Sequence, residues 1–299
     1  MALRRKPVRR KLGLRRRPAS GEQVAENRRA AIFYAITALG FVLLVTLGVW
    51  SRPKPVDTSG CPTNQMLPAA HTVVVIDQTD RFTPGQIDYA KKVILYEYGR
   101  LHRYDRLTVR GVGDDADAPQ RKFQLCRVQK RDEVLGIAVN EDQVARRFAD
   151  VAGKPLNRYL NSLAKVGEAR LSPLVETIAT ISREDDFGEG VAARRLVVIS
   201  DLAQHSGNFS QYPRQPGHDG AGRDGGGAIA LPADLGPYAA DLKGAVVRAH
   251  YLVRPSLRRV QGEAHQATWR AYFRRQGASD VAIGWGIGLG DNGRDGKTR

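Results

Sequence analysis

Acidic and hydroxyl side chains gather directly after a short apolar segment in the sequence HTVVVIDQTDRFT, residues 71–83. Four consecutive aliphatic residues, 73–76, form a continuous apolar run, which is typical of a buried central strand. Asp77, Thr79 and Asp80 follow where this run ends. Carboxylate and hydroxyl oxygens are the ligands that hard divalent cations prefer, so this segment is a candidate metal or ligand site.

A helix is expected to begin immediately after this segment. Thr83 has the side chain of an N-cap, Pro84 stands at the first helical position, and Gln86 completes a capping box. A buried strand, a polar loop and a helix N-terminus together form the geometry of a ligand or ion site. Such sites lie at the carboxyl edge of an open α/β sheet.

Two later segments carry similar side chains. Ser172 and Pro173 repeat the pattern of Thr83 and Pro84, and they open a shorter predicted helix that runs to about residue 183. A strongly apolar strand at 194–200 ends in a second acid, Asp201. Both segments are therefore candidates to approach the first one in the folded chain.

The elements that must position these residues alternate between strands and helices. Alternating apolar runs predict further strands at 106–112, 122–128, 245–253 and 281–285, and helical periodicity predicts helices at 84–102, 141–165 and 262–277. The connection between the strands at 106–112 and 122–128 is too short for a crossover helix, so this pair is expected to be antiparallel. The predicted fold class is α/β, with a doubly wound, mostly parallel sheet covered by helices on both faces.

One apolar segment precedes this domain. Residues 30–50 carry no charge over 21 positions, which is enough for a helix that crosses a hydrocarbon core of about 30 Å. We interpret the segment as a single transmembrane helix. A buried core helix and a cleaved signal peptide are the alternatives, but the segment is apolar all round and is longer than the usual hydrophobic region of a signal peptide.

The charge distribution sets the expected topology. Residues 1–29 hold eleven Lys or Arg and two acids, which gives this tail +9 of the net +16. A basic flank stays in the cytoplasm, so the folded domain is expected outside it, in the periplasm if the cell is Gram-negative. The tail is expected to lie against anionic lipid head groups. Specific nucleic-acid binding is not expected, because no aromatic residues interleave with the basic ones.

The remaining segments complete the predicted domain organisation. A proline-containing linker of mostly extended character occupies 51–70, and the domain itself spans 71–285. Within the domain, 207–236 is rich in Gly and Pro and is expected to be a long loop. The last segment, 286–299, is expected to be disordered.

The two cysteines, Cys61 and Cys126, lie outside the cytoplasm on this topology. Extracytoplasmic compartments permit disulfides, so the pair is a candidate bridge between the linker and the domain. Two free thiols are the alternative, because spacing alone does not prove pairing.

The three polar segments together resemble the von Willebrand factor type A family. In that family the first strand ends in Asp-x-Ser-x-Ser, a later loop supplies a Thr and the fourth strand ends in Asp, which together form a metal-ion-dependent adhesion site. The matching positions here are Asp77 with Thr79, Ser172 before the third helix, and Asp201. The resemblance covers residues 71–285 and implies a doubly wound sheet with Mg²⁺ or Mn²⁺ at its edge. Arg81 departs from the pattern, because it stands where the family has its second Ser.

Two interpretations of the site remain open. In one, Asp77, Thr79, Ser172 and Asp201 hold Mg²⁺ or Mn²⁺, with Asp80 as a substitute for the missing hydroxyl. In the other, Arg81 neutralises Asp77 or Asp201 and the site holds no metal.

The resemblance implies a protein-interaction module rather than an enzyme. We expect a membrane-anchored domain that recruits a membrane or extracytoplasmic protein at the carboxyl edge of the sheet, with Arg81 taking a partner carboxylate. The alternative is a phosphoesterase-like hydrolase that uses the strand-end carboxylates around Mg²⁺ or Mn²⁺, with His205 as acid or base. The sequence lacks a P-loop, a Gly-x-Ser-x-Gly elbow and the Asp-x-Asp-x-Thr spacing of aspartyl-phosphate phosphatases.

Overall fold

The computed structural model describes residues 21–50, 55–65, 67–113, 120–130, 133, 140–165, 169–207, 209–212 and 230–286. The chain divides into two compact units, Met1–Lys54 and Pro55–Arg299. Most of the basic tail, the start of the linker, most of the loop at 207–236 and nearly all of the last segment lie outside the described residues.

The first unit contains one long helix, α1 (Gly21–Trp50). Its segment Glu26–Thr46 is 21 residues long and contains a strongly apolar window of 18 residues, none of which is buried. By length and composition this segment is able to cross a membrane, although a signal sequence near an N-terminus meets the same criteria.

The second unit is built on a six-stranded sheet. Its strands are β1 (Ala70–Asp77), β2 (Arg106–Val112), β3 (Gln120–Cys126), β4 (Ala193–Ser200), β5 (Val246–Tyr251) and β6 (Asp280–Trp285). They are arranged in the order β3-β2-β1-β4-β5-β6. All neighbours are parallel except β2 and β3, which confirms the predicted sheet and its antiparallel pair.

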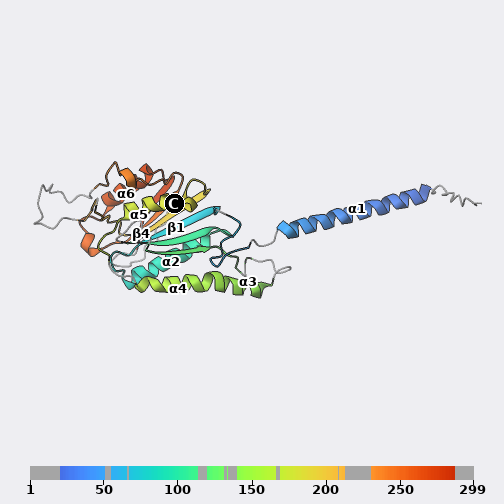
Figure 1. Ribbon diagram of the computed structural model, residues 1–299, viewed down its shortest axis with the longest axis horizontal. Helices are drawn as coiled ribbons and strands as arrows, with labels where there is room; N and C mark the ends of the chain where they lie inside the picture. Colours follow the sequence, from blue (N-terminus) through green and yellow to red (C-terminus); the bar gives the residue numbers. More distant parts are fainter. Residues whose placement is uncertain are drawn as a thin grey trace, which may run out of the picture. The chain divides into compact units, whose positions relative to one another are not determined.

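Helices cover both faces of this sheet (Figure 1). The helices are α2 (Pro84–Arg100), α3 (Glu141–Phe148), α4 (Lys154–Ser162), α5 (Leu174–Ser182) and α6 (Glu263–Arg275). Figure 1 shows α2 and α4 below the sheet and α5 and α6 above it. The continuous apolar run of β1 fits this two-sided burial, because Val73 and Val75 belong to the core under α5 and α6 while Val74 and Ile76 belong to the core under α2 and α4.

The sequence predicts a side-chain cap at the start of α2 and another at the start of α5, and only the first one forms. The predicted capping box of α2 is present, with Gln86 N donating to Thr83 Oγ1 at 3.3 Å and Thr83 N donating to Gln86 Oε1 at 3.0 Å. The predicted cap of α5 is wrong, because its N-cap is Pro173 without a side-chain hydrogen bond. The hydroxyl of Ser172 points elsewhere, to Asp77.

The predicted helix at 141–165 forms, but not as one regular α-helix. A π-helical segment, η2 (Ala149–Gly153), joins α3 to α4. A short 3-10 helix, η3 (Leu163–Lys165), follows α4. Pro155, which has no N–H to donate, is the second residue after the wider π turn of η2, and the helical backbone continues through both.

A disulfide ties the described part of the linker to the domain. Cys61 and Cys126 are bonded, with a Cα–Cα distance of 4.9 Å. The linker is not simply extended here, because the Asp57 carboxylate accepts the N–H groups of Ser59 and Cys61 in a tight turn. Gly60 has φ +73° in this turn and packs closely against the domain.

Candidate functional site at the carboxyl edge of the sheet

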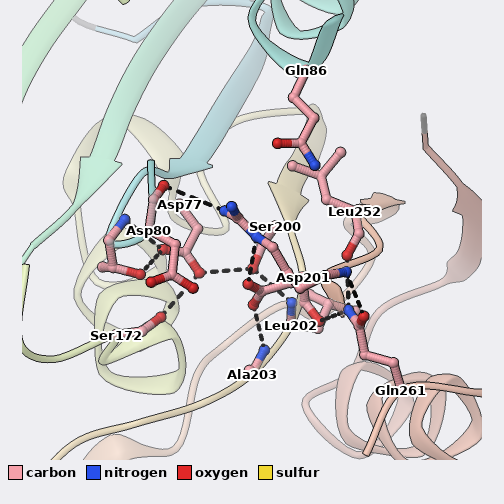
Figure 2. A network of polar contacts seen from close by, with 12 residues as sticks. Asp77, Asp80, Gln86, Ser172, Ser200, Asp201, Leu202, Ala203, Leu252 and Gln261 are labelled. Atoms are coloured by element: carbon pink, nitrogen blue, oxygen red, sulfur yellow. Dashed lines mark hydrogen bonds and ion pairs between the residues drawn. The ribbon is translucent and has the colours of Figure 1, made fainter. Parts of the chain in front are cut away.

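The register of the two central strands brings the first and third polar segments together. β1 and β4 are parallel neighbours with Ile76 opposite Ile199, so Asp77 and Ser200 follow at the same level of the sheet edge. Ser172 reaches the same place from the loop before α5 (Figure 2). Parallel strands end at one edge, which is why residues far apart in the sequence meet there.

Asp77 is the centre of a buried hydrogen-bond network. Its Oδ1 accepts Thr79 Oγ1 at 2.7 Å and Thr79 N at 3.2 Å. Its Oδ2 accepts Ser172 Oγ at 2.9 Å and Ser200 Oγ at 2.8 Å. All four residues are buried. Four donors to one carboxylate fix the three loops relative to one another.

Asp201 begins a tightly held loop at the end of β4. Its Oδ1 accepts Ala203 N at 2.9 Å, and the preceding Ser200 Oγ accepts Leu202 N at 2.7 Å. Leu202 has φ +58°, a left-handed conformation that is costly for a branched side chain. Such backbone strain persists only where the surroundings fix it, and it is enriched at functional sites.

A buried arginine compensates the charge of Asp201. Arg254, three residues after β5, donates from Nε to Asp201 Oδ2 at 3.1 Å. Its Nη1 donates to the carbonyl of Arg81 at 2.9 Å and its Nη2 to the carbonyl of Asp80 at 3.3 Å. The guanidinium also lies 5.5 Å from the ring centroid of Phe82. Arg254 thus joins the loops that follow β1, β4 and β5.

Gln261 also joins the loops that follow β4 and β5. Its Oε1 accepts Arg254 N at 2.8 Å, and its Nε2 donates to the carbonyls of Asp201 at 3.1 Å and Leu252 at 2.8 Å. Figure 2 shows Gln261 beside Asp201 and Leu252. The backbone around Arg254 is therefore held independently of its ion pair.

The electrostatics of the edge are dominated by its carboxylates. Burial, with repulsion from Asp77 and Asp80, raises the pKa of Asp201 to about 7, although the Ala203 N–H and the Arg254 guanidinium favour its charged form. Burial and the same three carboxylates raise the pKa of the Tyr212 phenol above its ordinary value. The site therefore attracts positive charge, and Arg254 is the cation that the structure shows on Asp201.

His205 lies close to the site but has partners of its own. Its backbone pairs with that of Ser172, through hydrogen bonds of 2.7 and 2.9 Å. Its Nδ1 lies 2.9 Å from Ser210 Oγ, and its ring packs on Tyr212 with centroids 5.3 Å apart. These contacts position the loop that carries Ser172, which is a structural role.

The donor set is a poor fit for a divalent cation. Mg²⁺ takes about six oxygen ligands at about 2.0–2.1 Å, whereas here a guanidinium donates to one of the candidate ligands, Asp201. A divalent cation and a guanidinium about 4 Å apart repel by about 8 kcal/mol at an effective dielectric constant of about 20. Across the described ranges, no three His, Cys, Asp or Glu side chains form a group able to hold a metal.

The structure brings most of the sequence-predicted residues together. Asp77, Thr79 and Ser172 are in direct contact, Asp201 lies beside them, and Asp80 is half-buried at the rim. The side chain of Arg81 is exposed, and its carbonyl is held by a buried arginine.

Sequence reasoning missed Ser200 and Arg254. Ser200 adjoins Asp201, and the parallel pairing of the two central strands would have placed its hydroxyl beside Asp77. Arg254 lies at the same sheet edge because β5 is parallel to β4. Inspection of the residues after every predicted parallel strand would have found it, but nothing in the sequence pairs it with Asp201.

Comparisons with known proteins do not show a family for this chain. No protein-family model matches the sequence, and no curated protein is significantly similar to it. Among solved structures, the chain is similar to the crystal structure of the conserved hypothetical protein BatB from Bacteroides thetaiotaomicron, with a TM-score of 0.36 and 13% sequence identity. The similarity covers 73% of this chain and 91% of that chain. A likeness this distant carries no argument about function.

Proposed function

We propose that this chain is a membrane-anchored, extracytoplasmic interaction module of the von Willebrand factor type A-like kind, which binds an acidic segment of a protein partner at the carboxyl edge of its sheet. The observation that carries the proposal is the clamp formed by Arg254 on the carbonyls of Asp80 and Arg81. This clamp fixes the backbone from which the exposed Arg81 side chain projects.

The charge of the rim favours an acidic partner. Three exposed arginines, the rim arginines, lie on two loops at this edge: Arg81, Arg258 and Arg259. Arg254 connects the two loops, because it belongs to the second and donates to the carbonyls of the first. Arginine presents a planar fork that matches a carboxylate bidentately, and a loop that is already ordered loses less conformational entropy on binding.

The membrane anchor in this proposal is α1. The apolar segment of α1 and the basic tail before it support an N-terminus in the cytoplasm, with the tail against anionic lipids. The Cys61–Cys126 disulfide supports an oxidising compartment for the domain. An anchored chain stays in the carbonate-washed membrane fraction at 32.9 kDa, whereas signal cleavage would release a smaller, soluble product.

Site-specific photo-crosslinking in native membranes tests partner binding. A photoreactive amino acid at Ser256, which is exposed in the loop that also carries Arg258 and Arg259, leaves all three rim arginines in place. We expect an adduct whose yield falls on the order of tenfold in Arg81→Glu, because a charge-assisted hydrogen bond contributes about 1.5–3 kcal/mol.

The matched control is Arg103→Glu. Arg103 is equally an exposed arginine, but it lies in the loop before β2, at the opposite edge of the parallel sheet. Its replacement makes the same change of net charge and should leave the yield unchanged. Equal yields from the two variants, or no adduct from Ser256, would refute the proposed function.

A further inference from the structure

A buried arginine, Arg254, supplies a positive charge at the carboxyl edge of the sheet. Asp201 and Arg254 are 4% and 8% exposed, so their ion pair is shielded from solvent. A buried carboxylate without a partner is strongly unfavourable, so such groups pair with a cation or bind a metal. The guanidinium of Arg254 fills this role at Asp201, where a divalent ion would fill it in an adhesion-type site.

Every nitrogen of the guanidinium has an acceptor. Nε donates to the Asp201 carboxylate, while Nη1 and Nη2 donate to the carbonyls of Arg81 and Asp80. The side chain therefore links an acidic strand end to the rim loop in one planar arrangement. A coordinated ion performs the same connecting task through carboxylate and backbone oxygens.

The backbone and packing hold Arg254 in this position. Gln261 binds the backbone on both sides of the ion pair, at Arg254 N and at the Asp201 carbonyl, and Phe82 packs on the guanidinium. The ion pair of Arg254 and Asp201 is therefore held in place by the fold and is not a surface contact.

We propose that Arg254 is a resident cation that replaces a divalent metal ion at this site, so that the edge is organised without Mg²⁺ or Mn²⁺. The inference concerns the chain alone and goes beyond the proposed function. If the inference about Arg254 is wrong, a partner can still bind at the rim. If no partner binds at the rim, the inference about Arg254 can still be correct.

Titration of the detergent-solubilised full chain with MnCl₂ tests the inference. Bound Mn²⁺ is measured by electron paramagnetic resonance, and the Tm is measured by scanning fluorimetry with Mn²⁺ or with EDTA. We expect the wild-type Tm to be the same in both. Arg254→Gln, which leaves Asp201 uncompensated, is expected to have a lower Tm and to regain part of it with Mn²⁺.

The control is Arg248→Gln, which removes an arginine from β5 that pairs with the exposed Asp280. The Tm of this variant should be the same with Mn²⁺ and with EDTA. A Mn²⁺-dependent rise of the wild-type Tm that Asp77→Asn abolishes overturns the inference. An Arg254→Gln variant that folds but has the same Tm with Mn²⁺ and with EDTA also overturns the inference.

A second comparison applies if Arg254→Gln does not fold. The double variant Asp201→Asn/Arg254→Gln removes both charges of the pair at once. It should fold if the guanidinium serves to compensate the carboxylate, because no buried charge is then left without a partner. Failure of the double variant to fold overturns the inference.

Discussion

Replacement of Asp77 by asparagine tests the network that fixes the three loops of the edge. Asp77→Asn keeps the shape of the side chain and removes its charge. The Thr79 N–H and hydroxyl can still donate to the amide oxygen, while the hydroxyls of Ser172 and Ser200 must rotate to accept from the new NH₂ group. All four hydrogen bonds therefore remain possible, but none is charge-assisted.

The expected cost follows from the difference between these bonds. A hydrogen bond to a charged group contributes about 1.5–3 kcal/mol and a neutral one about 0.5–1.5 kcal/mol, so four such exchanges cost about 4 kcal/mol. Removal of the repulsion between Asp77 and Asp201 offsets part of this cost. We expect the free energy of unfolding to fall by about 3 kcal/mol and the Tm by about 6–12 °C for a domain of this size.

Thermal unfolding of the full chain, followed by circular dichroism in detergent, measures this change. The control is Asp234→Asn, an exposed aspartate that accepts Gly236 N at 2.8 Å, and it should lower the stability by less than about 1 kcal/mol. If Asp77→Asn is no more destabilising than Asp234→Asn, Asp77 is not the centre of the network and the reasoning about this edge is wrong.

Three further predictions concern stability. The double variant Cys61→Ser/Cys126→Ser, which opens a loop with a sequence separation of 65, should lose about 4 kcal/mol in urea titrations, and an unchanged midpoint would contradict this. Burial lowers the pKa of His265 to about 4, below its unfolded value, so the contribution of His265 to stability should be complete above about pH 6.5 and fall by ~3 kcal/mol as the pH drops towards 4. His265→Gln should abolish that part of the pH dependence. If the stability of the wild type and of His265→Gln changes with pH in the same way, the assignment is wrong. Gly60→Ala should destabilise the chain by more than about 1 kcal/mol, because φ is +73° and a Cβ would lie 2.7 Å from a valine side chain. Gly85→Ala, in open space on α2, should be neutral or stabilising, and equal effects of the two changes would rule out this explanation.

The elements around the site were predictable because local chemistry and tertiary packing agree there. The apolar run before Asp77 is buried on both faces, and the capping box at Thr83 and Gln86 begins α2 where expected. The proximity of Asp77 and Ser172 required the family resemblance as well, because the two residues are separated by 95 positions.

The polar partners inside the site were less predictable. Ser172 has the sequence signature of a helix cap, yet its hydroxyl donates to a buried carboxylate, which is the stronger acceptor. Arg254 is 53 positions from Asp201, and only the placement of β5 beside β4 brings it there. Strand order and register decide such contacts, and residue periodicity does not encode them.

The most direct test of the proposed function is the affinity of the full chain for the partner that crosslinking identifies. Titration calorimetry compares the wild type with Arg81→Glu and Arg103→Glu in buffer containing EDTA. The proposal predicts wild-type binding without metal, a Kd that rises at least about tenfold in Arg81→Glu, and no change in Arg103→Glu. Equal affinities of the two variants would contradict the assignment of the rim arginines as the binding surface.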